Sequence, residues 1–318
     1  MRSLTLFVAL SLIACEEPPD VEDDAGSHAE LDAGRIEDAG RLQDASGEVD
    51  AALDDAGSVT DAGLPDAGPP DAGVRYGAGA WIRMHLADAR AYTGAYERRT
   101  RVETPALVHD ATGCCAKYAF DVRETEAPDR REVGFVDVSV RDLVSGDAWG
   151  GAIQSSGASG LTLYLANVVI DPGWPTWRSY SETNYDGIVL DGAAAIYAED
   201  LTIRNWNADG AIDDKAPVSQ FVRLTLEGSG HRGLRLWRPG PHYIVESSLE
   251  NDGMHGEGSL LWFRNCDGAE VRVYDTTFNG EATIAPSLIS CDEGRDPNIV
   301  YLESDPRETG EMHEMFSY

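Results

Sequence analysis

The sequence predicts an all-β domain, a parallel β-helix with about 23 residues per coil, behind a long acidic N-terminal segment. Three consecutive segments begin at Gly187, Gly210 and Gly233, and each is 23 residues long. Short apolar triplets recur at the same period within them. All seven tryptophans and all twelve tyrosines lie after residue 74, so a core-forming domain is expected to begin there.

Residues 1–14 have the features of a bacterial secretory signal. Arg2 precedes an apolar run over residues 4–14, which is too short to span a bilayer. The run ends in Leu12-Ile13-Ala14-Cys15, which resembles the lipobox of bacterial lipoproteins. This resemblance implies that Cys15 is lipidated and anchors the chain to a membrane, which we expect to be the outer membrane or the cell surface. An ordinary cleaved signal that contains a cysteine is the alternative.

Residues 15–74 are expected to be a disordered tether. The segment contains 18 acidic residues against Arg35 and Arg41, and like charges with low hydrophobicity keep a chain extended. A cation-binding repeat is the alternative, but the segment lacks the regular spacing of a calcium loop. The tripeptide Asp-Ala-Gly occurs seven times, beginning at Asp24, Asp32, Asp38, Asp55, Asp61, Asp66 and Asp71.

The composition limits the partners and the redox chemistry of the chain. The formal net charge of −31 argues against nucleic acid as a partner, because nucleic acids need a basic surface. Besides Cys15, four cysteines remain for an oxidising compartment. A disulfide between Cys266 and Cys291 is the first pairing to expect, with Cys114 or Cys115 as competing partners. The cysteine spacing does not indicate zinc.

The repeat predicts short strands. Each apolar triplet is followed by polar turn residues, a pattern typical of strands rather than helices. Stacked coils would place Ile203, Leu226 and Leu249 in one column of the core, and Ala198, Phe221 and Ile244 in another. We expect an N-terminal cap over residues 75–130, about seven coils over 131–284 and a C-terminal cap or tail over 285–318. The triplets are Val138-Ser139-Val140, Val168-Val169-Ile170, Leu201-Thr202-Ile203, Leu224-Thr225-Leu226, Ser247-Ser248-Leu249 and Thr276-Thr277-Phe278.

This pattern resembles the pectate lyase-like β-helix, and the resemblance implies a right-handed coil. The coil before Gly187 is longer than its neighbours, and its extra residues carry Trp174, Trp177 and Tyr185. Such a loop suits the stacking of sugar rings on aromatic faces. A lid folded over the core is the alternative interpretation.

A row of charged residues runs beside that loop. The residue before each initial glycine is Asp186, Asp209, Arg232 or His255. These side chains, with Lys215, Arg235 and Trp237 on the following strands, are expected to line a lateral groove with rungs about 4.8 Å apart. Ordinary turn chemistry on a solvated edge is the alternative.

Asp213 interrupts the repeat. Strict register would place its carboxylate between Leu190 and Leu236 in the core, where an unpaired charge is costly. Either the coil slips by one residue at Gly210-Ala211, which turns Ile212 inward and Asp213 outward, or Asp213 pairs with Arg235. We favour the slip, which would expose Asp213 and Lys215 together.

The groove motifs are similar to those of polygalacturonases, which are β-helical pectin hydrolases. Their order and one-coil spacing are matched by Asn184-Tyr185-Asp186-Gly187, Asn207-Ala208-Asp209-Gly210 and Gly230-His231-Arg232-Gly233. The resemblance implies that Asp186 and Asp209 are the acid and the water-activating carboxylate, with His231 tuning one of them. Two departures are that Ala208 replaces the first aspartate of a pair and that no downstream Arg-x-Lys is found.

Pectate lyases imply a second chemistry for the same groove. In that family acidic residues bind calcium, and an arginine or lysine removes the proton beside a uronate. Here Asp209, Asp213 and Asp214, next to Asp186, would hold Ca²⁺ through carboxylate oxygens. Lys215, Arg232 or Arg235 would be the base, which requires a lowered pKa.

Three classes of function follow from the sequence. The first is an enzyme that cleaves an acidic polysaccharide, by lyase rather than hydrolase chemistry. The second is a non-catalytic glycan-binding domain that uses Trp174, Trp177, Arg232 and Arg235. The third is a structural or adhesive surface protein in which the β-helix is a spacer.

Overall fold

The computed structural model describes twelve stretches of the chain, and several expected features lie outside them. Outside the described residues lie the signal, Cys15, the tether, Cys114, Cys115, Trp174, Trp177 and His255. In the described part no helix is long and apolar enough to cross a membrane. The described residues are 77–86, 91–96, 101–104, 107–110, 118–123, 132–141, 149–156, 160–171, 184–206, 209–228, 230–251 and 258–318.

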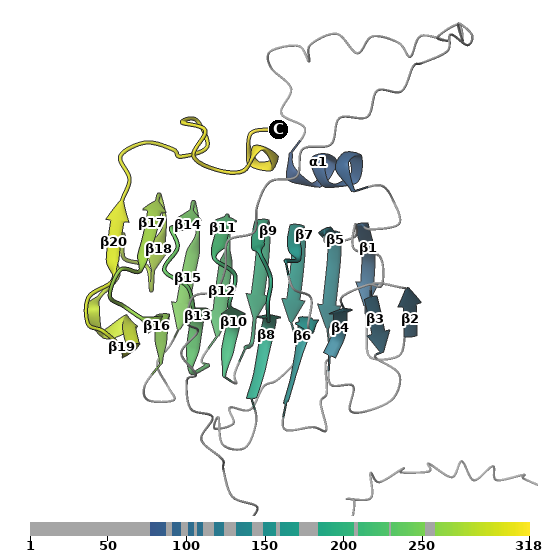
Figure 1. Ribbon diagram of the computed structural model, residues 1–318, viewed down its shortest axis with the longest axis horizontal. Helices are drawn as coiled ribbons and strands as arrows, with labels where there is room; N and C mark the ends of the chain where they lie inside the picture. Colours follow the sequence, from purple (N-terminus) through teal and green to yellow (C-terminus); the bar gives the residue numbers. More distant parts are fainter. Residues whose placement is uncertain are drawn as a thin grey trace, which may run out of the picture. The chain divides into compact units, whose positions relative to one another are not determined.

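The domain is all-β and consists of two long sheets of mainly parallel strands, as expected (Figure 1). Three strands continue the first sheet beside its main path: β12 (Thr225–Gly228), β15 (Ser248–Asn251) and β18 (Thr277–Phe278). The main path of the first sheet is β1 (Ala91–Tyr96), β5 (Glu132–Arg141), β7 (Thr162–Asp171), β9 (Ala195–Arg204), β11 (Val218–Val222), β14 (His242–Val245), β17 (Glu270–Tyr274) and β20 (Asn298–Tyr301).

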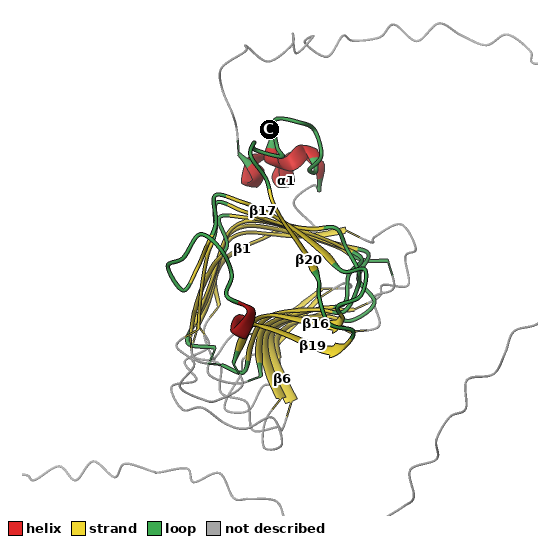
Figure 2. Cartoon of the chain, turned by 90° about the vertical axis from the view of Figure 1, so that its left-hand side faces the viewer, coloured by secondary structure: helices red, strands yellow, loops and turns green. Residues whose placement is uncertain are grey.

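The second sheet has nine strands, and the chain passes alternately between the two sheets from β4 onward. Each strand therefore lies beside the equivalent strand of the next coil, and Figure 2 shows the sheets facing each other around one core. This arrangement is compatible with a β-helix-like fold. The strands of the second sheet, in their order across it, are β19 (Ile289–Glu293), β16 (Ser259–Asn265), β13 (Arg232–Leu236), β10 (Gly210–Asp214), β8 (Asn184–Leu190), β6 (Trp149–Ser156), β4 (Tyr118–Arg123), β3 (Leu107–Asp110) and β2 (Arg101–Thr104).

The two predicted columns of the core are confirmed. Leu226 lies opposite Ile203 on one side and Leu249 on the other. Phe221 likewise lies between Ala198 and Ile244. All six side chains are fully buried, so residues 23 positions apart in the chain are direct neighbours in the core.

Residues with a left-handed backbone conformation form a column that bends the first sheet at the same point of successive coils. The backbone φ of Asp137, Asn167 and Asp200 lies between 53° and 55°, although none of them is glycine. Asn167 donates a hydrogen bond to Asp137 at 2.7 Å, and Arg223 donates to Asp200 at 2.6 Å. Short polar residues tolerate this conformation better than most, and bonds to the next coil stabilise it. Three later coils repeat the feature at Arg223, Glu246 and Asp275.

The outer face of the first sheet is covered by both ends of the described chain. Helix α1 (Ala78–His85) packs Trp81 and Ile82 against this face, and the last residues pack Met315 and Phe316 of the short helix η2 (Glu314–Phe316) beside it. The carbonyl of Tyr318 accepts a hydrogen bond from the backbone N–H of Gly77 at 3.0 Å. The C-terminal segment therefore returns along the sheet to the start of the domain (Figure 1).

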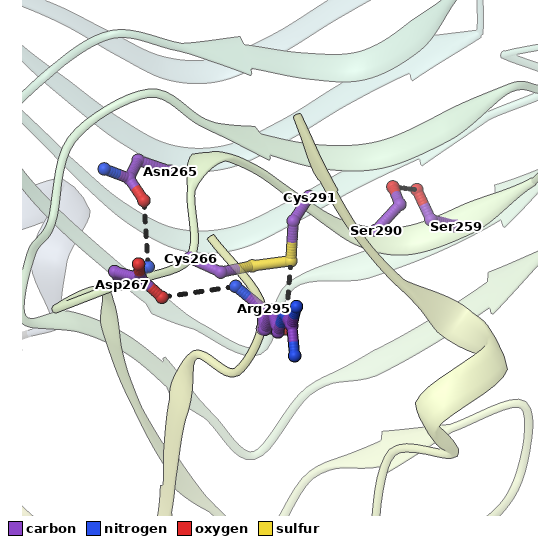
Figure 3. The surroundings of a disulfide bond; sticks show 7 residues. All are labelled: Ser259, Asn265, Cys266, Asp267, Ser290, Cys291 and Arg295. Carbon is purple, nitrogen blue, oxygen red and sulfur yellow. Dashed lines mark hydrogen bonds between the residues drawn. A yellow bond between two sulfur atoms is a disulfide. The ribbon is translucent and has the colours of Figure 1, made fainter. Parts of the chain in front are cut away.

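The disulfide Cys266–Cys291 joins the last two strands of the second sheet, as predicted. Its Cα atoms are 5.7 Å apart, and 25 residues separate the two cysteines in the sequence. Between them lies the turn after β16, where Asp267 accepts a hydrogen bond from the backbone of Arg295 at 3.2 Å (Figure 3). The short helix η1 (Pro286–Leu288) leads into β19. The bond thereby closes the final coil covalently, which limits the freedom of its unfolded chain.

Candidate functional site

The slip predicted at Gly210-Ala211 is present. Gly210, rather than Asp209, lies opposite Asp186 and Arg232. The predicted single column of Asp186, Asp209 and Arg232 is therefore wrong, because β10 is shifted by one residue relative to both neighbours. The shift turns Ile212 into the core between Ile188 and Leu234.

The same slip places Asp213 on the outer side of the second sheet, beside Val189 and Arg235. Both alternatives considered from the sequence thus occur together, since Arg235 Nε also lies 3.5 Å from Asp213 Oδ1. The expectation that Asp213 is exposed is wrong. Its exposed fraction is 4% because Arg235, Trp237 and Lys215 contact it.

Arg235 is the centre of a buried charge cluster. Its Nη1 lies 2.6 Å from Asp209 Oδ2 and 3.6 Å from Asp186 Oδ1, while its Nε faces Asp213. The three aspartates and Arg235 are all less than 10% exposed. Arg235 is therefore the one cation that faces all three of these buried carboxyl groups. Arg232 also pairs with Asp209 and Lys215 with Asp213, but Asp186 depends mainly on Arg235.

Asp209 is also bound by residues of the predicted motifs. Arg232 donates to its Oδ1 at 3.0 Å, and His231 Nδ1 lies 3.4 Å from the same oxygen. With its amide nitrogen turned toward the carboxylates, Asn184 donates to Asp209 at 3.0 Å and to Asp186 at 3.3 Å. The structure therefore brings together Asn184, Asp186, Asp209 and His231, as the motif spacing predicted.

Asp186 differs from Asp209 in its electrostatics. Burial raises the pKa of Asp186 well above its ordinary value, and the neighbouring Asp213 and Asp209 raise it further, while Arg235 and Lys215 act in the opposite direction. Among the described residues none donates a hydrogen bond to its buried Oδ1. A carboxyl group in this setting retains its proton to a higher pH than usual and can serve as a donor.

Two indole rings alternate with the cations on this face. Trp237 donates from Nε1 to Asp213 at 2.5 Å, and its ring lies 5.2 Å from that of Trp262. Lys215 lies 5.1 Å from the centre of the Trp237 ring, and Arg232 lies 5.3 Å from the centre of the Trp262 ring. Trp262 was not recognised from the sequence, although it lies opposite Arg235 on β16.

Lys215 does not have the properties of a general base. Burial acts to lower its pKa, but contacts with Asp191 and Asp213 outweigh burial and raise it. The ammonium group touches Asp191 and lies 3.2 Å from Asp213. A base needs the opposite shift, so Lys215 acts here as a fixed cation. Asp191 was not recognised from the sequence.

The predicted calcium ligands are not brought together. Asp214 lies between Leu190 and Leu236 on the core side, whereas Asp209 and Asp213 belong to the charge cluster around Arg235. In the described ranges no group of three His, Cys, Asp or Glu side chains could hold a metal ion. The slip that turned Asp213 outward is the reason, because it places the next carboxylate inside.

Tyr185 is a further residue whose predicted position is wrong. Its side chain is 5% exposed and belongs to the core, so it does not offer a surface to a ligand. Of the predicted sugar-binding aromatic residues, Trp237 is half-buried on the outer face, while Trp174 and Trp177 lie outside the described residues.

No protein-family model matches the chain. No curated protein and no solved structure matches it significantly either.

Proposed function

We propose that the chain is a surface lipoprotein with a right-handed β-helix of the pectate lyase-like type. The outer face of its second sheet binds an acidic polysaccharide. The observation that carries this proposal is the half-buried Trp237, fixed by Asp213 and flanked by Lys215. An indole ring can stack on the C–H face of a sugar, while neighbouring cations attract its carboxylates. Lipid at Cys15 and a spacer over residues 15–74 would hold this face away from the membrane.

Binding is favoured over hydrolysis by the position of Arg235. An inverting hydrolase needs a water molecule between its two carboxyl groups, which stand about 6.5–9.5 Å apart. Here Arg235 Nη1 lies 2.6 Å from Asp209 and 3.6 Å from Asp186. The guanidinium therefore occupies the space that the water would need.

The binding proposal predicts that Trp237→Ala weakens affinity for polygalacturonate about tenfold or more, which corresponds to roughly 1.4 kcal/mol. Binding to the full chain, with Cys15→Ser to prevent lipidation, is measured by calorimetry and tryptophan fluorescence. Arg204→Ala is the control, because Arg204 is an exposed cation on β9 that pairs with Glu227 at 3.0 Å. It should leave the affinity unchanged. Failure of the parent chain to bind any acidic polysaccharide would refute the proposal.

Cleavage is the second candidate, because the raised pKa of Asp186 suits a proton donor. If it occurs, the parent chain releases new reducing ends or unsaturated uronates from polygalacturonate. Asp186→Asn, which keeps the shape of the side chain but cannot donate a proton as an acid, should lower this rate by about 10²–10⁴. Binding without any product would exclude cleavage and leave the binding proposal in place.

A further inference from the structure

A second polar cluster lies inside the domain, behind the candidate site. Asp214 is the last residue of β10 in the second sheet, and Ser219 and His242 lie on β11 and β14 of the first sheet. All three side chains have an exposed fraction of 0%. The cluster therefore joins the two sheets at one corner and connects two successive coils, since Ser219 lies opposite His242.

Hydrogen bonds connect the three side chains in a chain. Asp214 Oδ1 accepts from the backbone N–H of Ala216 at 2.9 Å, and its Oδ2 contacts Ser219 Oγ. His242 Nδ1 lies 3.0 Å from the same Ser219 oxygen, and His242 Nε2 lies 2.9 Å from the carbonyl oxygen of Arg238.

The donors and acceptors in this series of hydrogen bonds can be counted. The Arg238 carbonyl only accepts, so His242 Nε2 must carry a hydrogen. In a neutral ring Nδ1 is then an acceptor, and the single hydroxyl hydrogen of Ser219 must point to it. Ser219 Oγ can then only accept from Asp214, which requires a protonated carboxyl group. If both Asp214 and His242 lacked the extra proton, one of these contacts would bring two lone pairs together in the core.

We infer that Asp214, Ser219 and His242 form a buried, pH-sensitive hydrogen-bonded link between two coils. In this link one proton rests on Asp214 and His242 stays neutral. Holding the proton on the carboxyl group leaves no net charge among the three buried side chains, whereas placing it on His242 would create a buried ion pair. Loss of the proton at higher pH breaks the chain of hydrogen bonds between the two coils. The corner that supports Asp213 and the outer site is then weakened.

The electrostatic surroundings agree with this distribution of the proton. Burial raises the pKa of Asp214 to about 7 and Asp213 raises it further, while the hydrogen bonds that Ser219 and the backbone of Ala216 can donate to the ionised carboxylate act in the opposite direction. Burial lowers the pKa of His242, against the hydrogen bond with the Arg238 carbonyl. The nearby charges of β10 and β13 belong to Asp213, Lys215 and Arg235, which contact one another on the outer side.

The test replaces the acid by its neutral mimic. In Asp214→Asn the amide can donate permanently to Ser219 and still accept from Ala216. Below about pH 4 the wild-type carboxyl is protonated in both folded and unfolded chains. Between about pH 4 and 7 only the folded chain keeps the proton, so its stability falls as the pH rises. The folding equilibrium constant of the variant relative to wild type should therefore rise on the order of a thousandfold by about pH 8.

Denaturant unfolding of the full Cys15→Ser chain and of its variants measures this ratio. Asp275→Asn is the matched control, because Asp275 is exposed and its left-handed backbone conformation suits asparagine. Its ratio to wild type should stay constant with pH. A flat ratio for Asp214→Asn would overturn the inference.

A second measurement requires no variant. The ¹⁵N shifts of the His242 ring in the folded protein should report a neutral imidazole with its hydrogen on Nε2 at about pH 6. A doubly protonated ring at that pH would place the proton on His242 and overturn the inference. Neither test depends on whether the outer face binds a polysaccharide.

Discussion

Replacing Arg235 by methionine should lower the free energy of unfolding by about 3–5 kcal/mol at a pH near 8. The substitution keeps much of the side-chain volume but leaves Asp186, Asp209 and Asp213 together without the cation that faces all three. Arg232 would still contact Asp209 and Lys215 would still contact Asp213, but no comparable partner would remain for Asp186.

The loss should be smaller at a pH near 5. Arg235 lowers the pKa of Asp186, so its removal raises that pKa further above the ordinary value. The folded variant then binds more protons than its unfolded chain, and its stability falls as the pH rises. Protonation at low pH removes the buried charge and recovers much of the lost stability.

Denaturant unfolding of the Cys15→Ser chain at the two pH values is the measurement. Arg204→Met is the matched control, because the Arg204–Glu227 pair is about half-exposed. Such a pair contributes about 0–1 kcal/mol, so the control should change little at either pH. A similar small loss in Arg235→Met would show that Arg235 does not compensate the three carboxyl groups.

The coil repeat could be predicted from the sequence because it is a property of spacing. Residues 23 positions apart share one environment, so Ile203, Leu226 and Leu249 carry the same apolar character. The positions at which each coil bends within the first sheet could not be predicted in the same way. The left-handed column begins with Asp137, Asn167 and Asp200 but continues with Arg223, so no single residue type marks it.

The site was predicted only in part, because strict alternation of side chains fails in the second sheet. Ala211 and Ile212 both belong to the core, although they are consecutive. After two consecutive inward-facing residues, each later residue of the strand points to the opposite side from the one that strict alternation predicts. This reversal turned Asp213 outward and Asp214 inward, and a period of 23 residues carries no signal for it.

The charges of the site were easier to identify than their states. Asp186, Asp209 and His231 were found from turn motifs and their one-coil spacing, and Arg235 from its place on the following strand; the structure brings the four together. That Arg235 lies between two carboxyl groups depends on side-chain direction and burial. Those features decide whether the site can activate water, and they depend on contacts between coils.

Truncation of Phe221 tests the stacking of the coils. Phe221→Ala should lower the free energy of unfolding by about 3–5 kcal/mol, because a fully buried ring between Ala198 and Ile244 leaves a cavity. Val169→Ala is the control on the same sheet, since Val169 is only partly buried. It should lower the free energy of unfolding by much less.

A double-variant cycle makes the test specific for vertical contact. Phe221→Ala combined with Ile244→Ala should deviate from additivity by about 0.5–3 kcal/mol, because the second truncation removes atoms that line the cavity of the first. Phe221→Ala combined with Val140→Ala should be additive, since β7 and β9 separate β5 from β11. Additivity in both pairs would mean that Phe221 and Ile244 are not neighbours. The outer site would then lose its basis, because Asp213, Arg235 and Trp262 are brought side by side by the same stacking.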